Sequence, residues 1–110
     1  MTDHYHRYFY NATFPNVSLF PGSGVFHSSE IVSVFGTYPR DGATEQQIAL
    51  SNTMQSIWAG FAKNPYAGPG WAEVPTVGVF QTSGVQAETY WHVDGGFCAL
   101  YKPYYDVIGD

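Results

Sequence analysis

The feature that most limits the fold of this chain is its wealth of aromatic side chains. Nine tyrosines, eight phenylalanines and three tryptophans make up 18% of only 110 residues. Large rings are stabilised by burial, and one domain of this length has few interior places for so many of them. We therefore expect an incomplete core, in which some rings need partners from outside the chain.

The remaining composition is that of a globular protein. Hydrophobic residues make up 45% and charged residues 12% of the chain, which is far from the low hydrophobicity and high charge of disordered segments. A chain of 110 residues suits one domain or part of one. The net charge is −5 with four lysines and arginines in all, so we expect neither nucleic acid nor an anionic membrane surface as a partner.

Two short patterns favour secretion. Asn11 and Asn16 begin N-x-[ST] tripeptides and are candidate glycosylation sites. No apolar run approaches a membrane span of ~20 residues, and the first residues do not have the pattern of a signal peptide. Cys98 is the single cysteine, so it is either a buried thiol or an orphan whose disulfide partner lies elsewhere.

The pattern of apolar residues and turn formers predicts α/β structure with about two strands. Residues 5–14 are rich in tyrosine and phenylalanine and predict a strand with both faces buried. A loop rich in proline and glycine follows over residues 15–24. Residues 77–80 form a second short apolar run that is typical of a strand.

Helices are expected in three places. Thr44 and Gln47 have the spacing of a capping box, and an apolar stripe runs from Leu50 to Phe61 before Asn64-Pro65 ends this long amphipathic helix. A short helix or turn is expected after Ser28 or Ser29, either of which is a plausible N-cap, and should end at Gly36. A third helix would begin at Asp94, include Cys98, Leu100 and Tyr101, and be interrupted or kinked by Pro103.

His27 is the candidate for proton transfer. Histidine is the residue type that most often transfers protons in enzymes, and His27 follows a loop rich in glycine, as a side chain that projects into a cleft often does. His4 and His6 alternate on the first strand, but no further ligands follow at metal-binding spacing, so we expect no metal site. His92 lies among aromatic residues and is expected to be a packing residue.

A nucleophile is missing from the chain. No G-x-S-x-G elbow occurs. Cys98 as a nucleophile with His27 as its base is an alternative, but no cationic neighbour would stabilise a thiolate there, and a structural role is favoured. The glutamates Glu30, Glu45, Glu73 and Glu88 fall in unrelated settings and predict no carboxylate pair. We expect no cofactor.

Residues 24–36, GVFHSSEIVSVFG, closely resemble the H-x-x-E-I-x-x-V-F-G stretch around the catalytic histidine of the cholinesterase and type-B carboxylesterase family. Residues 49–65, ALSNTMQSIWAGFAKNP, resemble the helix that follows in that family, and residues 97–101, FCALY, its last cysteine-bearing helix. Residues 7–11 resemble the strand before the histidine loop. The resemblance thus extends over nearly the whole chain, 1–110, as a partial type-B domain with the C-terminal part of an α/β-hydrolase fold.

The resemblance implies a serine esterase whose triad follows the chain order serine, acid, histidine. His27 matches the histidine, and Glu30 matches a glutamate near the site, which we interpret as support for the histidine loop. Cys98 matches a cysteine paired far upstream. The serine, the acid and the oxyanion loop have no counterpart in this chain, so we expect it to be inactive alone, to expose apolar surface that drives self-association, and to act on a small carboxylic ester only in a full-length, secreted form. The alternative is a non-enzymatic, aromatic-rich interaction module that uses the same scaffold.

Overall fold

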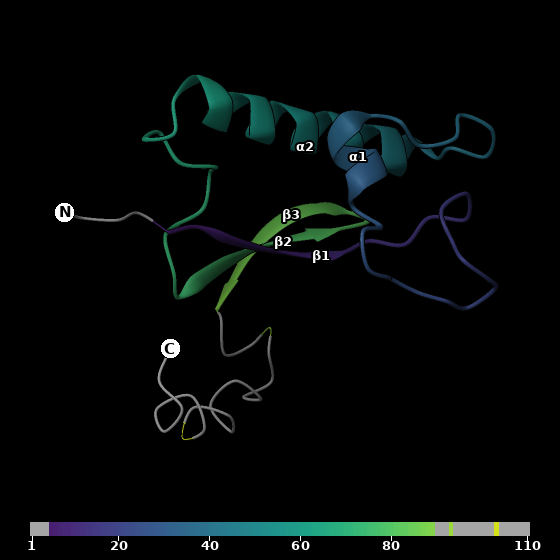
Figure 1. Ribbon diagram of the computed structural model, residues 1–110, viewed down its shortest axis with the longest axis horizontal. Coiled ribbons are helices and arrows are strands. Elements are labelled where there is room, and N and C mark those ends of the chain that lie inside the picture. The colour runs from purple at the N-terminus through teal and green to yellow at the C-terminus, as the bar shows by residue number, and fades with distance from the viewer. Residues whose placement is uncertain (1–4, 90–92, 94–102, 104–110) are drawn as a thin grey trace.

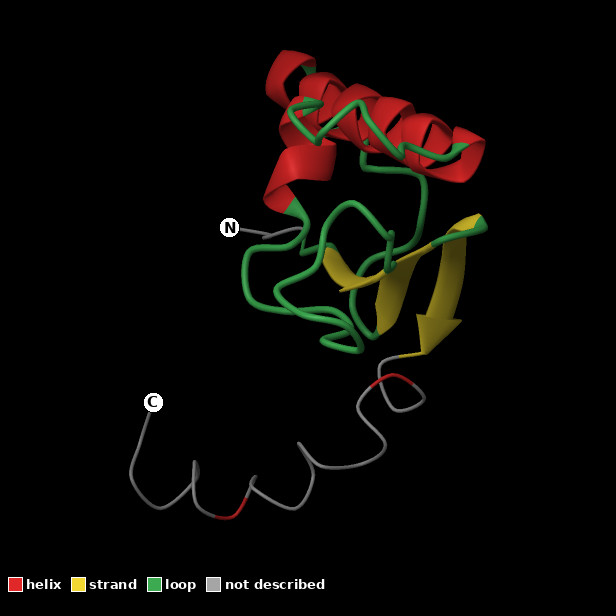
Figure 2. Cartoon of the chain, turned by 90° about the vertical axis from the view of Figure 1, so that its right-hand side faces the viewer, coloured by secondary structure: helices red, strands yellow, loops and turns green. Residues whose placement is uncertain are grey.

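The computed structural model describes residues 5–89, Val93 and Pro103. The helices and strands between residues 7 and 89 form two layers. Two helices lie together on one face of a small three-stranded sheet, as the two perpendicular views show (Figures 1 and 2). The prediction of mixed α/β structure is therefore confirmed for this part of the chain. The elements are β1 (Arg7–Asn11), α1 (Ile31–Phe35), α2 (Glu45–Lys63), β2 (Thr76–Gln81) and β3 (Gly84–Thr89).

The sheet has the order β1-β2-β3. β1 and β2 are parallel, with Tyr10 opposite Phe80, and β2 and β3 form an antiparallel hairpin. The sequence predicted about two strands, and the described structure has a third, β3. β3 has no buried residue. Its apolar residues, Val85 and Ala87, form only a short alternation with Gln86 and Glu88, and its position follows from pairing with β2.

β1 is not buried on both faces, which corrects the prediction for residues 5–14. It extends over Arg7–Asn11 alone, and Tyr10 is its one buried residue. Phe9, on the opposite side of the strand, has 43% of its surface exposed. The reason is that the helices of the described structure cover only one face of the sheet, as Figure 1 shows.

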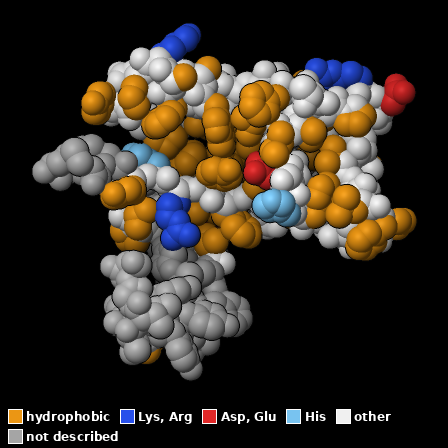
Figure 3. All heavy atoms as spheres, viewed as in Figure 1, with side chains coloured by type: hydrophobic (Ala, Val, Ile, Leu, Met, Phe, Trp, Pro, Cys, Tyr) orange, Lys and Arg blue, Asp and Glu red, His pale blue; other side chains and the backbone are white. Residues whose placement is uncertain are grey.

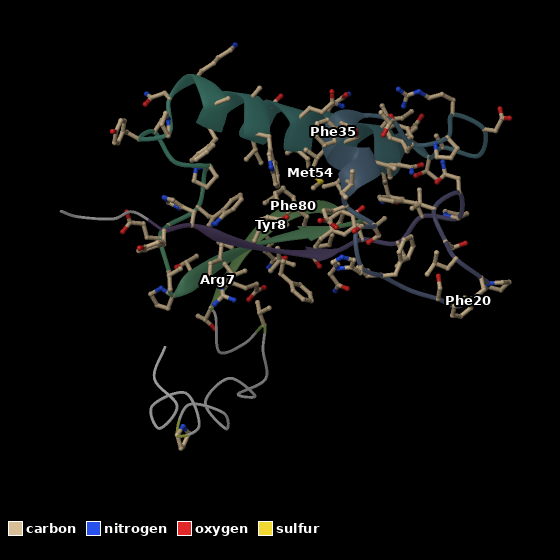
Figure 4. All side chains as sticks on the ribbon, in the orientation of Figure 1. Arg7, Tyr8, Phe20, Phe35, Met54 and Phe80 are labelled. Atoms are coloured by element: carbon tan, nitrogen blue, oxygen red, sulfur yellow. The ribbon has the colours of Figure 1, made fainter. Side chains whose placement is uncertain are left out.

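α2 begins and ends where its sequence predicts. The Thr44 side chain accepts a hydrogen bond from the Gln47 backbone N–H at 3.1 Å, and the helix ends at Lys63. Leu50 and Met54 are buried beneath it, and in Figure 4 Met54 projects from α2 toward the sheet. The apolar stripe is buried only in part, since Phe61 is 63% exposed.

α1 forms where a short helix is expected, but its first cap differs. The N-cap position belongs to Glu30, without a side-chain hydrogen bond, and not to Ser28 or Ser29. Ser28 has φ 75°, a left-handed conformation that closes a turn rather than starting a helix. The C-cap is Gly36 with φ 68°, as predicted.

Aromatic rings fill the space between the two layers. Phe80, fully buried near the carboxyl end of β2, lies edge-on to Tyr8 and to Trp71, with ring centroids 5.8 and 5.6 Å apart. Trp71 packs so closely on Gly78 that a Cβ there would overlap the indole ring. The buried cluster consists of Tyr10, Ala12, Phe14, Leu50, Met54 and Phe80.

Many apolar side chains nevertheless remain at the surface, as the aromatic content predicts. Leu19, Phe20 and Phe35 are each exposed by more than half of their surface. Figure 3 shows hydrophobic atoms spread over one face of the molecule and gathered between helices and sheet. The expected C-terminal helix and Cys98 lie outside the described residues.

Candidate functional site

His27 lies in the connection that leaves the carboxyl end of β1 and leads to α1. Two backbone hydrogen bonds fold this connection immediately before the helix, from Ser29 N to Phe26 O at 3.0 Å and from Ile31 N to Ser28 O at 3.2 Å. The first of these bonds encloses His27, whose side chain is exposed. The turn directly before α1 therefore determines where the imidazole of His27 lies.

None of the described residues forms a hydrogen bond or an ion pair with the imidazole of His27. Glu30, three residues later, is half-buried at the start of α1 and forms no ion pair with it. The described structure thus brings His27 and Glu30 into one turn without joining their side chains. A nucleophile and an orienting acid would have to reach His27 from outside this part of the chain.

The Glu30 carboxylate acts instead on the tyrosines of β1. Burial raises the pKa of Tyr8, and the negative charge of Glu30 raises it further. The pKa of Tyr10 is raised mainly by burial and also by Glu30, while the hydrogen bond to Ser33 opposes the shift. The charge of Glu30 therefore raises the pKa of both phenols.

A buried set of hydroxyl groups joins β1, α1 and α2. The hydroxyls of Tyr10 and Ser33 share a hydrogen bond of 3.2 Å, and Ser51 Oγ donates to the Ser33 carbonyl at 2.7 Å. Gln55 Nε2 then donates to Ser51 Oγ at 3.0 Å. These residues are missing from the predicted site. The available signal was Ser33 itself, a polar residue within the apolar run IVSVF.

A separate apolar cavity of about 280 Å³ lies between the second half of α2 and the first half of β1. Its walls include Tyr8, Trp58 and Trp71, and Figure 3 shows the apolar surface between the two layers. Two buried atoms, His6 Nδ1 and Trp71 Nε1, have no hydrogen-bond partner among the described residues. Neither His27 nor Glu30 lines this cavity.

The remaining candidates occupy different places. Asn11 ends β1 with an exposed side chain, whereas Asn16 Nδ2 donates to the Pro39 carbonyl at 2.7 Å. Within the described ranges no group of three or more histidine, cysteine, aspartate or glutamate residues could hold a metal ion. His4, His92 and Cys98 lie outside those ranges. None of the described helices has the length and apolar character needed to cross a membrane.

Comparison with known proteins identifies esterases and lipases that are similar to part of this chain. The chain is 36% identical over 66 residues to chlorogenic acid esterase of Aspergillus niger, which covers 58% of this chain and 13% of the relative. It is 36% identical over 64 residues to secreted lipase 5 of Gibberella zeae, covering 57% of the chain and 12% of the relative. Carboxylesterase 1D of Mus musculus is 44% identical over 52 residues, covering 43% and 9%. No protein-family model matches.

The matched segments span about an eighth or less of the length of these relatives. Esterases and lipases act on carboxylic esters, and the three relatives carry such names. Over 43–58% of its length, this chain is therefore a homologue of carboxylesterases and lipases, as its sequence resemblance predicted.

Proposed function

We propose that this chain contributes the general-base histidine, His27, to a carboxylic ester hydrolase that acts through a serine acyl-enzyme. The observation that carries the proposal is the exposed imidazole in the connection after the carboxyl end of a parallel strand, within the HSSEIVSVFG stretch. Ligand sites of open α/β sheets lie outside the carboxyl ends of their parallel strands. The similarity to esterases and lipases supports the same assignment.

The chemistry assigned to His27 is a proton transfer in two directions. The imidazole takes the proton of a serine hydroxyl as the serine oxygen bonds to the ester carbonyl carbon, and returns it to the alcohol when the ester C–O bond breaks. Water then repeats the sequence on the acyl-enzyme. The serine, the acid and the oxyanion donors belong to sequence outside these 110 residues, so residues 1–110 are a partial α/β-hydrolase domain that is inactive alone.

Glu30 supports the histidine turn and does not exchange the proton. Its half-buried position at the N-cap of α1, three residues after His27, supports this role. Secretion, glycosylation at Asn11 and Asn16, and a disulfide from Cys98 to a cysteine outside the chain belong to the same proposal. The name of secreted lipase 5 agrees with the first of these.

The test replaces the matching segment of the Aspergillus niger esterase with this chain and measures hydrolysis of a short-chain chromogenic ester. We expect His27→Ala to lower kcat by several orders of magnitude while KM stays within about tenfold. Glu30→Gln should lower kcat by about ten- to a hundredfold. His6→Ala, at the other described histidine, is the matched control and should have little effect.

Two results would contradict the proposal. If His27→Ala lowered kcat by less than about tenfold, His27 would not be the general base. If Glu30→Gln lowered kcat more than His27→Ala does, Glu30 and not His27 would have the larger catalytic role. The exposed aromatic surface favours the second candidate, a non-enzymatic interaction module. An active chimera that depends on His27 would exclude that candidate as the sole function.

A further inference from the structure

The contact between β1 and α1 is unusual because a polar residue lies at its centre. Of the residues in α1, only Ser33 is buried, with 1% of its surface exposed. A helix normally faces a core with an apolar side chain, and a buried hydroxyl is costly unless it is hydrogen-bonded. Ser33 meets that requirement through Tyr10 of β1, at 3.2 Å.

The backbone of Ser33 is held as well. α1 is five residues long, too short to be stable by itself. Its last carbonyl groups lack helical partners, and Thr37 N bonds to Val32 O, which leaves the Ser33 carbonyl to another donor. Ser51 of α2 supplies that donor at 2.7 Å. α1 is thus fixed from the strand on one side and from the long helix on the other.

We propose that Tyr10 is a positioning residue for His27, because its hydroxyl fixes Ser33 and thereby holds α1 and the turn that precedes it. The inference rests on the proposed function for its catalytic consequence. Apolar contacts are non-directional, whereas a hydrogen bond between buried hydroxyls restrains both the distance and the direction between its partners. A displacement of about 1 Å at a catalytic group can lower turnover by about a hundredfold.

The path from Tyr10 to His27 is short and continuous. Ser33 N and Val34 N both bond to the Glu30 carbonyl, at 3.0 Å each. The next bonds toward the N-terminus are Ile31 N to Ser28 O and Ser29 N to Phe26 O. A shift of Ser33 is therefore passed through the first turn of α1 to the residues around His27.

Tyr10→Phe tests this role with the loss of one oxygen atom. Tyr8→Phe is the matched control, because Tyr8 lies two residues away on the same strand and none of the described residues bonds to its hydroxyl. Amide hydrogen exchange of the full chain should become at least tenfold faster at Ser29, Ile31 and Ser33 in Tyr10→Phe than at β2 amides. Tyr8→Phe should cause no such difference.

The catalytic arm uses the esterase chimera. Tyr10→Phe should lower kcat by about tenfold or more with KM unchanged, while Tyr8→Phe changes kcat by less than about twofold. Equal effects of the two variants on exchange and on kcat, or faster exchange throughout the molecule, would overturn the positioning role. If His27→Ala leaves kcat unchanged, the proposed function is wrong. The hydrogen-exchange rates of the turn around His27 then still test whether Tyr10 orders that turn.

Discussion

The side chain of Gln55 occupies the place where any residue larger than glycine at position 36 would put its Cβ. A Cβ on Gly36 would lie 2.8 Å from Gln55 Nε2. Gly36 also has φ 68° at the end of α1, a conformation that costs other residues roughly 1–2 kcal/mol. The contact between this glycine and this glutamine lets α1 end directly against α2.

Gly36→Ala should therefore lower the free energy of unfolding by about 1–2 kcal/mol, from the left-handed backbone and from displacement of Gln55. Gly60→Ala is the matched control. Gly60 lies within α2 with open space around its Cα, so alanine there should raise the free energy of unfolding by up to about 1 kcal/mol. Urea denaturation followed by circular dichroism measures both. Equal changes for the two variants would contradict this reading of Gly36.

Thr44→Ala removes the side-chain cap of α2. We expect a loss of about 1 kcal/mol in the free energy of unfolding, since the Gln47 N–H loses its acceptor at the helix start. Thr53→Ala, at an exposed position within the same helix, should be neutral or slightly stabilising because alanine has the higher helix propensity. A loss for Thr53→Ala as large as that for Thr44→Ala would refute the cap.

Met54→Ala leaves a cavity between α2 and the sheet. Met54 is completely buried, and such truncations cost about 2–5 kcal/mol. Phe61→Ala truncates a larger side chain on the same helix that is mostly exposed, and should change stability by less than about 1 kcal/mol. If thermal unfolding showed the greater loss for Phe61→Ala, the core assigned to this chain would be wrong.

The tyrosines of β1 make stability sensitive to alkaline pH. Burial, aided by Glu30, raises the pKa of Tyr10 in the folded chain, so the folded state holds the phenolic proton more tightly than the unfolded state. The resulting stability is complete below the ordinary tyrosine pKa of about 10 and is lost as pH rises through the folded value. Denaturation midpoints should fall above pH ~10, and less steeply in Tyr10→Phe. An equal slope in both proteins would contradict this.

The chain by itself should hydrolyse no ester above the buffer rate between pH ~5 and 9, because an imidazole without serine and oxyanion donors is a weak catalyst. Its exposed apolar side chains should bind a hydrophobic dye strongly or drive self-association. Dye fluorescence and sedimentation measure this. Hydrolysis that disappears in His27→Ala of the short chain would overturn the fragment interpretation, and a monomer that unfolds in one sharp transition without binding dye would overturn the incomplete core.

Local chemistry in the sequence determined the elements whose signals are contained within them. Thr44 caps α2, Lys63 ends it before Asn64-Pro65, and Gly36 ends α1, because caps and breakers act through bonds between residues close in the chain. The stretch around His27 likewise predicted the relationship to esterases that the comparisons confirm at the level of carboxylesterases and lipases. The catalytic role of His27 stays a prediction.

Tertiary structure decided the features that depend on residues far apart in the chain. β3 exists because β2 offers it a partner, although its own residues have little burial. β1 is buried on one face only, since helices cover only that side in the described structure. The bond from Tyr10 to Ser33 joins residues 23 positions apart. No local pattern encodes such a pairing, because its free energy comes from packing that forms only when strand and helices meet.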